Sequence, residues 1–224
     1  NCETTILKNV KNLYAGHQLR IKKGGNPIVE KWWDTSNHIK KNNLNEKDQI
    51  EEFKDIFTDA CKIRMRSDVS IGTSLSGGLD SSSVLATMSY INTLKNFDNR
   101  ASKNWNKAFC LDYKDTGYSE KKFAEIVANY TKFSIFNKEI NLSKISEKDL
   151  ISSTISFEAV QEPSIGPWYI YQKMRNENVV VSLDGHGGDE LLAGYENYPS
   201  KAMNDHYLPW NNTGTFEQLQ KIIL

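Results

Sequence analysis

The sequence has little that would mark a membrane protein or a nucleic-acid-binding protein. No stretch approaches the roughly 20 apolar residues that a membrane-spanning helix needs. Lys plus Arg and Asp plus Glu balance at 28 each, so no overall field attracts nucleic acid or an anionic membrane surface. We therefore expect a cytoplasmic protein with neither nucleic acid nor membrane as a partner.

Cysteine is also scarce. The three cysteines, Cys2, Cys61 and Cys110, are odd in number, widely spaced and form no Cys-x-x-Cys pair. This pattern argues against a zinc site and against a disulfide framework. Cys110 lies in an apolar run and is expected in the core of a strand.

Two common nucleotide-binding motifs are missing. No lysine follows the glycines as a Walker A motif requires, and there is no Gly-x-Gly-x-x-Gly fingerprint. In their place, residues 76–82 read Ser-Gly-Gly-Leu-Asp-Ser-Ser, between an apolar run at 69–75 and a helical pattern at 83–90. The pattern predicts a strand, a glycine-rich turn and a helix.

Such a turn has the properties of an anion cradle. Its glycines let backbone N–H groups converge, and the helix N-terminus adds partial positive charge. A carboxylate, Asp80, beside a phosphate cradle indicates a bridging divalent cation. The alternative is a tight strand-to-helix turn with an N-cap serine.

A second glycine-rich loop follows the apolar run at 178–183. Residues 184–190 read Asp-Gly-His-Gly-Gly-Asp-Glu, and Asp189 and Glu190 are expected at the start of a short helix, where negative charge is favoured. The alternative is a loop whose polar residues have no function.

The order of the expected elements predicts the fold class. Strands at about 69–75, 107–112, 132–136 and 178–183 alternate with helical patterns, which favours an α/β fold with an open, mostly parallel sheet and helices on both faces. Ligands of such sheets bind beyond the carboxyl ends of the strands, where the winding reverses. If the first strand lies beside the fourth, Asp80 and Asp189 can share one Mg²⁺, with ATP phosphates between them.

The remaining segments are expected to be scaffold. A small β segment with a turn at 24–27 precedes the sheet. A polar connector at 36–47 is the expected domain boundary, which divides the chain into 1–35, 36–47 and 48–224. Residues 48–66 read as an amphipathic helix. Its apolar residues are expected to face inward, namely Ile50, Phe53, Ile56, Phe57 and Ala60.

On these motifs the chain resembles the asparagine synthetase family, in its synthetase domain, which belongs to the ATP-pyrophosphatase (PP-loop) group with its Rossmann-like fold. Residues 76–82 match the pyrophosphate loop of that group, and 184–195 resemble the second loop of the family. Glu162-Pro163 looks like the acidic segment that precedes this second loop. Residues 4–34 are similar to the end of the family's glutaminase domain, so we expect a fragment cut at both ends, with little activity alone.

The resemblance implies a two-step reaction. The side-chain carboxylate of aspartate attacks the α-phosphorus of ATP, which gives β-aspartyl-AMP and pyrophosphate. Ammonia, released from glutamine by the glutaminase domain of the same parent chain, then displaces AMP to give asparagine. A homodimer is a further expectation.

The resemblance also implies roles for single residues. Asp80 and Asp189 would hold Mg²⁺, and Glu162 and Gly188 would lie at the aspartate. The pyrophosphate contacts would be Ser76, Gly77, Gly78, Ser81 and Ser82. The adenosine contacts would be Ser74, Leu75, Leu111, Asp184 and Gly185.

His186 departs from the family pattern, which has Glu at this position in asparagine synthetases and Tyr in a related β-lactam-forming enzyme. A histidine titrates near neutral pH and could take the proton that leaves the attacking amine. Alternatively, it packs in the loop. The departure leaves open an adenylating relative that acts on another carboxylate, in peptide or β-lactam ring closure or sugar modification, and a non-catalytic nucleotide-binding module.

Overall fold

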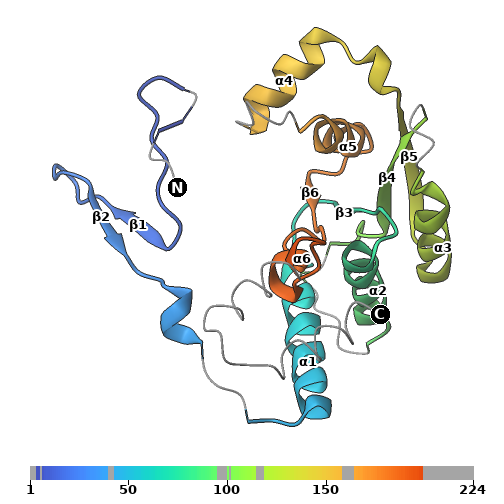
Figure 1. Ribbon diagram of the computed structural model, residues 1–224, viewed down its shortest axis with the longest axis horizontal. Coiled ribbons are helices and arrows are strands. Elements are labelled where there is room, and N and C mark those ends of the chain that lie inside the picture. Colours follow the sequence, from blue (N-terminus) through green and yellow to red (C-terminus); the bar gives the residue numbers. More distant parts are fainter. Residues whose placement is uncertain are drawn as a thin grey trace, which may run out of the picture. The chain divides into compact units, whose positions relative to one another are not determined.

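The computed structural model describes residues 4–5, 7–39, 43–94, 100, 102–114, 119–157 and 164–198 (Figure 1). The chain forms two compact units, residues 58–144 with 169–224 and residues 1–57 with 145–168. Among the described helices, none is both long enough and apolar enough to cross a membrane. Both glycine-rich loops belong to the first of these units.

This unit is built on a four-stranded parallel sheet. The strands are β3 (Ile71–Ser74), β4 (Lys107–Tyr113), β5 (Ser134–Ile140) and β6 (Val181–Ser182), in the order β5-β4-β3-β6. The predicted α/β class with an open parallel sheet is confirmed. The prediction that the first strand lies beside the fourth is confirmed as well, because β3 pairs with β6.

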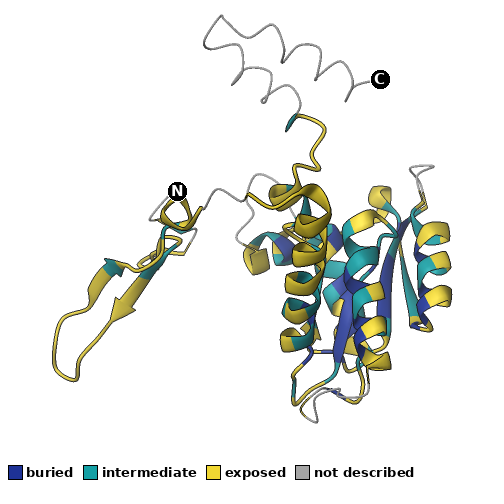
Figure 2. Cartoon of the chain, turned by 90° about the horizontal axis from the view of Figure 1, so that it is seen from below, coloured by how far each residue is buried: buried dark blue, intermediate teal, exposed yellow. Residues whose placement is uncertain are grey.

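Helices pack on the sheet, and its two central strands, β3 and β4, are mostly buried (Figure 2). The helices α2 (Leu79–Thr93) and α3 (Lys121–Thr131) contact each other and the strands β3, β4 and β5. The helix α5 (Ile165–Asn176) contributes Ile170 and Met174 to a core cluster with Phe109 and Val179. Cys110 is fully buried in β4, as predicted.

The strand order creates a switch point. The chain winds from β3 through β4 to β5 in one direction, and then returns to place β6 on the opposite side of β3. The winding therefore reverses between β3 and β6, where an open α/β sheet forms its ligand crevice. The two glycine-rich loops follow these two strands.

The other unit contains a hairpin of β1 (His17–Arg20) and β2 (Ile28–Lys31). The strands are antiparallel with Leu19 opposite Val29, and the N–H of Gly25 donates to the carbonyl of Lys22 at 2.9 Å in the turn. The predicted β segment is thus confirmed, and its turn closes at residues 22–25, two residues before the predicted turn at 24–27. The helix α4 (Glu147–Phe157) belongs to the same unit, whereas the 3₁₀ helix η2 (Leu142–Lys144) belongs to the unit of the parallel sheet.

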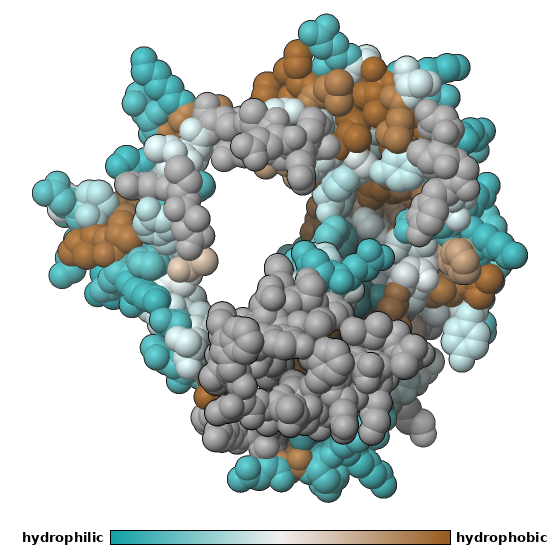
Figure 3. Space-filling model, viewed as in Figure 1, coloured by the Kyte–Doolittle hydropathy of each residue, from teal (hydrophilic) through white to brown (hydrophobic). Residues whose placement is uncertain are grey.

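The hairpin carries apolar side chains on its surface. Leu19, Ile28 and Val29 are about half exposed, and Figure 3 shows this apolar surface at the left of the view. An isolated two-stranded hairpin is marginally stable in water, and contiguous exposed apolar surface marks an interaction site. The hairpin is therefore suited to pack against further structure.

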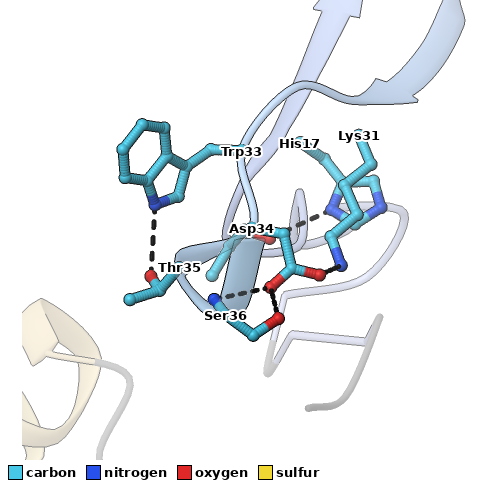
Figure 4. Close-up of polar contacts among 7 residues, drawn as sticks. His17, Lys31, Trp33, Asp34, Thr35 and Ser36 are labelled. Atoms are coloured by element: carbon cyan, nitrogen blue, oxygen red, sulfur yellow. Dashed lines mark hydrogen bonds and ion pairs between the residues drawn. The ribbon is translucent and has the colours of Figure 1, made fainter. Parts of the chain in front are cut away.

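A capped turn ends the hairpin (Figure 4). The carboxylate of Asp34 accepts hydrogen bonds from the ammonium of Lys31 at 2.6 Å and from the backbone N–H of Ser36 at 3.1 Å. The hydrogen bond from Lys31 is the main cause that lowers the pKa of Asp34 to about 2. Asp34 thereby caps the 3₁₀ helix η1 (Thr35–His38), where the indole of Trp33 donates to Thr35 at 3.1 Å.

The helix α1 (Glu46–Arg64) corrects one prediction. Ile50, Phe53 and Ile56 are 57%, 43% and 63% exposed, so the expectation that they face inward is wrong. Phe57 and Ala60 are half-buried. Apolar periodicity shows which face of a helix is apolar, but not whether a neighbour covers that face.

Candidate functional site

The first loop is shaped by glycine. Gly77 has φ +85°, and a β carbon there would lie 2.5 Å from Cβ of Phe123 and 2.6 Å from the backbone nitrogen of Ala124. Both the left-handed backbone and the close approach of α3 require a residue without a side chain. Gly78 then occupies the N-cap position of α2.

The serine hydroxyls of this loop differ in their partners. Ser76 Oγ accepts from the N–H of Gly78 at 3.1 Å and lies 3.0 Å from Ser81 Oγ. Ser82 Oγ is buried and has no hydrogen-bond partner among the described residues. A buried hydroxyl without a hydrogen-bond partner carries a desolvation cost.

Asp184 ties the second loop to the first strand. Its side chain is 8% exposed, and its carboxylate accepts from Ser74 N at 2.7 Å, Ser182 Oγ at 2.5 Å and Tyr171 Oη at 3.0 Å. Burial, together with this neighbouring carboxylate, raises the pKa of Tyr171 to about 12. Asp184 is thus an anchor that holds β6 and its loop at the carboxyl end of β3.

The two loops touch. A β carbon on Gly185 would lie 2.7 Å from the backbone nitrogen of Ser81. A β carbon on Gly188 would overlap the carboxyl group of Asp80, at 2.8 Å from its Oδ1 and closer still to its other atoms. The carboxylate of Asp80 therefore rests on the backbone of the second loop, at the start of α6 (Gly188–Leu192).

A cavity of about 320 Å³ opens where the loops meet. Four of its lining residues are acidic and one is a histidine, and none of its described lining residues is a lysine or an arginine. The lining residues are Ser74, Ser76, Asp80, Ser81, Asp184, Gly185, His186, Gly187, Asp189, Glu190 and Tyr195.

Glu190 and Tyr195 are a pair that the sequence did not single out as site residues. The hydroxyl of Tyr195 donates to Glu190 Oε1 at 2.7 Å. This hydrogen bond is the main cause that lowers the pKa of Glu190 and raises the pKa of Tyr195 to about 12. Ala193 has φ +57° and turns the chain back after α6. The sequence did not predict that turn, because alanine has no marked preference for positive φ.

His186 lies on the rim of the cavity. Its side chain is 73% exposed, and Nδ1 lies 3.8 Å from Asp184 Oδ2. It does not pack in the core, and it is close enough to the buried carboxylate for a charge interaction when protonated.

Several predicted site residues are not among those that line the cavity. Leu75 is buried, and its N–H donates to the carbonyl of Phe109 at 2.8 Å. Leu111 packs against the core cluster. Glu162 lies outside the described residues. The others that do not line the cavity are in the loops themselves: Gly77, Gly78, Ser82 and Gly188.

The carboxylates of Asp80 and Asp189 suit a hard cation. Among the described residues there is no group of three or more His, Cys, Asp and Glu side chains that could hold a metal ion. Mg²⁺, however, is usually held by one or two carboxylates together with substrate phosphates and water. Asp80 and Asp189 line one cavity, and they fit that requirement.

Comparison with known proteins places the chain in a family. The asparagine synthase family model matches residues 52–222. The chain belongs to the asparagine synthase family. The glycine-rich loops, the switch point and the acidic cavity all lie inside the matched residues.

The relatives of the chain within this family are longer proteins. A Methanocaldococcus jannaschii protein that carries the name asparagine synthetase (glutamine-hydrolyzing) 2 is 36% identical over 149 residues, which covers 65% of the chain and 26% of that protein. Asparagine synthetase (glutamine-hydrolyzing) 1 of Bacillus subtilis is 29% identical over 196 residues, which covers 87% of the chain and 29% of that protein. Amidase chyE of Penicillium rubens is 24% identical over 219 residues (92% and 32%).

The chain thus spans between a quarter and a third of the length of these three relatives. Among solved structures, the NH3-dependent NAD synthetase from Campylobacter jejuni aligns with a TM-score of 0.38 and 16% identity, covering 65% of the chain and 60% of that protein.

Proposed function

We propose that the chain is the ATP-binding part of an amide-forming ligase that makes asparagine. Aspartate is activated as β-aspartyl-AMP with release of pyrophosphate, and ammonia derived from glutamine then forms the amide. The observation that carries the proposal is the contact of Asp80 with Gly188 at the mouth of an acidic cavity, in a member of the asparagine synthase family.

The charge of the cavity supports a metal–nucleotide complex. Four carboxylates without a lysine or arginine among the described lining residues repel a bare polyphosphate. Mg²⁺ held by Asp80 and Asp189 would neutralise phosphate charge and stabilise the charge that develops on pyrophosphate. In this proposal Ser76, Ser81 and Ser82 donate their hydroxyls to the phosphates.

The remaining nucleotide contacts would come mainly from backbone. Gly77 and Gly78 would present N–H groups to pyrophosphate at the start of α2. The side chain of Leu75 is buried and that of Asp184 is held by three hydrogen bonds. We therefore propose that these two residues contact adenosine through backbone atoms at the strand ends. The same holds for Ser74, Leu111 and Gly185.

The proposed chemistry is balanced in two steps. The β-carboxylate oxygen of aspartate attacks the α-phosphorus, and the bond to the bridging oxygen of the β-phosphate breaks, so that pyrophosphate leaves. Ammonia then attacks the acyl carbon, the C–O bond to AMP breaks and one proton is lost. We propose His186 as the base for this proton, because its imidazole lies on the cavity rim beside Asp184. Glu162 and Gly188 remain proposed contacts of aspartate.

The N-terminal residues fit the same proposal. We propose that 1–35 end a glutaminase-type β domain, that 36–47 connect it, and that 48–224 are the synthetase part. The exposed apolar side chains of the β1–β2 hairpin support this division, since a further sheet would cover them. A cytoplasmic homodimer is part of the proposal.

A second candidate keeps the adenylation and changes the acceptor. His186 in place of the family's Glu favours it, and a relative of the chain carries the name amidase. In that case another carboxylate is activated at the same cavity. The two candidates differ only in which acid supports pyrophosphate exchange.

The test is aspartate-dependent exchange of labelled pyrophosphate into ATP, in the full-length parent protein with Mg²⁺. The proposal expects exchange that requires aspartate and is lost in Asp80→Asn, while the exposed Asp59→Asn on α1 keeps it. A folded parent that binds Mg-ATP but exchanges nothing with aspartate would refute asparagine formation. Exchange with another carboxylic acid would then support the second candidate, and none with any acid would favour a non-catalytic module.

A further inference from the structure

A second and larger cavity, of about 770 Å³, lies at the opposite edge of the sheet. Its lining residues immediately precede β3, β4 and β6, whereas the acidic cavity follows β3 and β6. Both cavities belong to the same unit. The lining residues are Ser67, Asp68, Val69, Ser70, Arg100, Ser102, Lys103, Asn104, Arg175, Asn178 and Val180.

Backbone hydrogen bonds fix the segments that line this cavity. The N–H of Ser67 donates to the carbonyl of Arg100 at 3.1 Å, and the N–H of Ile71 donates to the carbonyl of Asn104 at 3.0 Å. These bonds hold the segment before β3 against the segment before β4. The third wall is the end of α5 and the turn into β6, where Asn178 has φ +58° and its N–H donates to the carbonyl of Arg175 at 3.1 Å.

The charge of the lining is basic. The lining contains Arg100, Lys103 and Arg175 and a single acid, Asp68, in a chain whose charges balance overall at 28 each. The lining thus carries three basic residues against one acid, and the part of the chain that the structure describes offers no ion-pair partner to Lys103 or Arg175.

One of these cations has a local explanation. Arg175 lies in the last turn of α5, where a basic residue offsets the negative end of the helix dipole. Lys103 and Arg100 belong to the segment between α2 and β4 and end no helix. The helix dipole thus does not account for the convergence of the three cations on one cavity.

We propose that this cavity binds a small phosphate-bearing polyanion, at a site separate from the ATP site. Arg side chains present planar donor pairs to phosphate oxygens, and Lys adds a compact charge. Ser70 contributes a polar group from the wall before β3, and Asn178 contributes one from the wall that carries Arg175. A volume of about 770 Å³ lies within the usual range for small-molecule pockets. The site does not depend on the proposed ligase activity.

The experiment titrates tripolyphosphate into the 224-residue chain by calorimetry in EDTA at low salt. Without a divalent cation, the acidic cavity repels the probe, so binding reports the basic cavity. We expect one site whose affinity falls as salt rises. The charge reversal Lys103→Glu with Arg175→Glu is expected to weaken binding about tenfold or more, since two attractions become repulsions.

The matched control reverses the same net charge elsewhere, with Lys122→Glu on α3 and Lys148→Glu on α4, and is expected to bind within about twofold of the parent. Arg175→Gln is a milder variant in case the double reversal does not fold, and a fall of about threefold is expected. Circular dichroism checks folding in each case.

Three results would overturn the proposal. The first is no saturable binding by the parent chain. The second is an equal loss of affinity in the reversal and in the control, which would mean that only net charge matters. The third is binding of a polyglutamate peptide but not of tripolyphosphate, which would assign the cavity to an acidic protein segment.

Discussion

The carboxylate of Asp80 lies against the backbone of Gly188, so closely that a β carbon on Gly188 would overlap it. The two residues are brought together by the pairing of β3 with β6. Each comes from the first turn of a helix that follows its strand, α2 and α6 respectively. The contact joins the two glycine-rich loops into a single site, and its disturbance should affect both ligand binding and folding.

Gly188→Ala tests this contact. The added methyl group forces the Asp80 carboxylate away, which should weaken Mg-ATP binding about tenfold or more and lower the free energy of unfolding by about 1–3 kcal/mol. Calorimetry and urea titration measure the two effects. Gly25→Ala is the control, because its β carbon would meet nothing closer than 3.4 Å. Unchanged Mg-ATP affinity in Gly188→Ala would show that the position of Asp80 does not matter.

The sequence predicted the elements of this site better than their ends. The strands expected at 107–112 and 178–183 are observed at Lys107–Tyr113 and Val181–Ser182. Their β-branched and apolar residues select a strand locally, but pairing with a neighbour decides where it ends. The Glu190–Tyr195 pair was missed because it depends on the backbone turn at Ala193, a residue with no marked preference for positive φ.

The wrong prediction for α1 has the same origin. The apolar residues of its first half have helical spacing, yet Ile50, Phe53 and Ile56 stay exposed. Ile56→Gln is therefore expected to change the free energy of unfolding of the 224-residue chain by no more than about 0.5 kcal/mol. Leu85→Ala, at a fully buried position of α2, should cost about 2–5 kcal/mol in the same urea titration. A comparable loss in both variants would mean that Ile56 is covered in solution.

Asp184→Asn tests the anchor between β6 and β3. The amide has the size of the carboxylate, and its oxygen can still accept from Ser74 and Ser182 in the place of Oδ1, but its NH₂ group replaces Oδ2 and cannot accept the hydrogen bond that Tyr171 donates. Because the new NH₂ group and the Tyr171 hydroxyl are both donors in a buried place, we expect the free energy of unfolding in urea to fall by about 1–3 kcal/mol. The exposed Asp59→Asn should stay within about 0.5 kcal/mol. Equal stability of the two variants would show that the anchor contributes nothing.

The Tyr171 hydroxyl predicts a dependence of stability on alkaline pH. Its pKa is raised from 10.0 to about 12, so the folded chain holds this proton more tightly than the unfolded chain does. The contribution to stability is complete below pH 10 and is lost as the pH rises from 10 toward 12. The urea midpoint should therefore fall more between pH 9 and pH 11 in the parent chain than in Tyr171→Phe. Tyr90→Phe, at an exposed position of α2, should show the same fall of the midpoint as the parent chain. An equal fall in all three chains would contradict the raised pKa of Tyr171.

Gly77→Ala and Gly24→Ala separate backbone strain from steric overlap. Both glycines have positive φ, +85° and +75°, so alanine at either position pays about 1–2 kcal/mol for the left-handed backbone. A β carbon on Gly24 would meet nothing within 4 Å, whereas one on Gly77 would meet Phe123 at 2.5 Å. Gly77→Ala should therefore lose about 1–3 kcal/mol more than Gly24→Ala in urea unfolding, and it should also weaken Mg-ATP binding. If the two losses are equal, α3 yields to the methyl group without cost, and the loop does not need Gly77 for its packing. A larger loss at Gly77 would instead show that the loop needs a residue without a side chain where it meets Phe123 of α3.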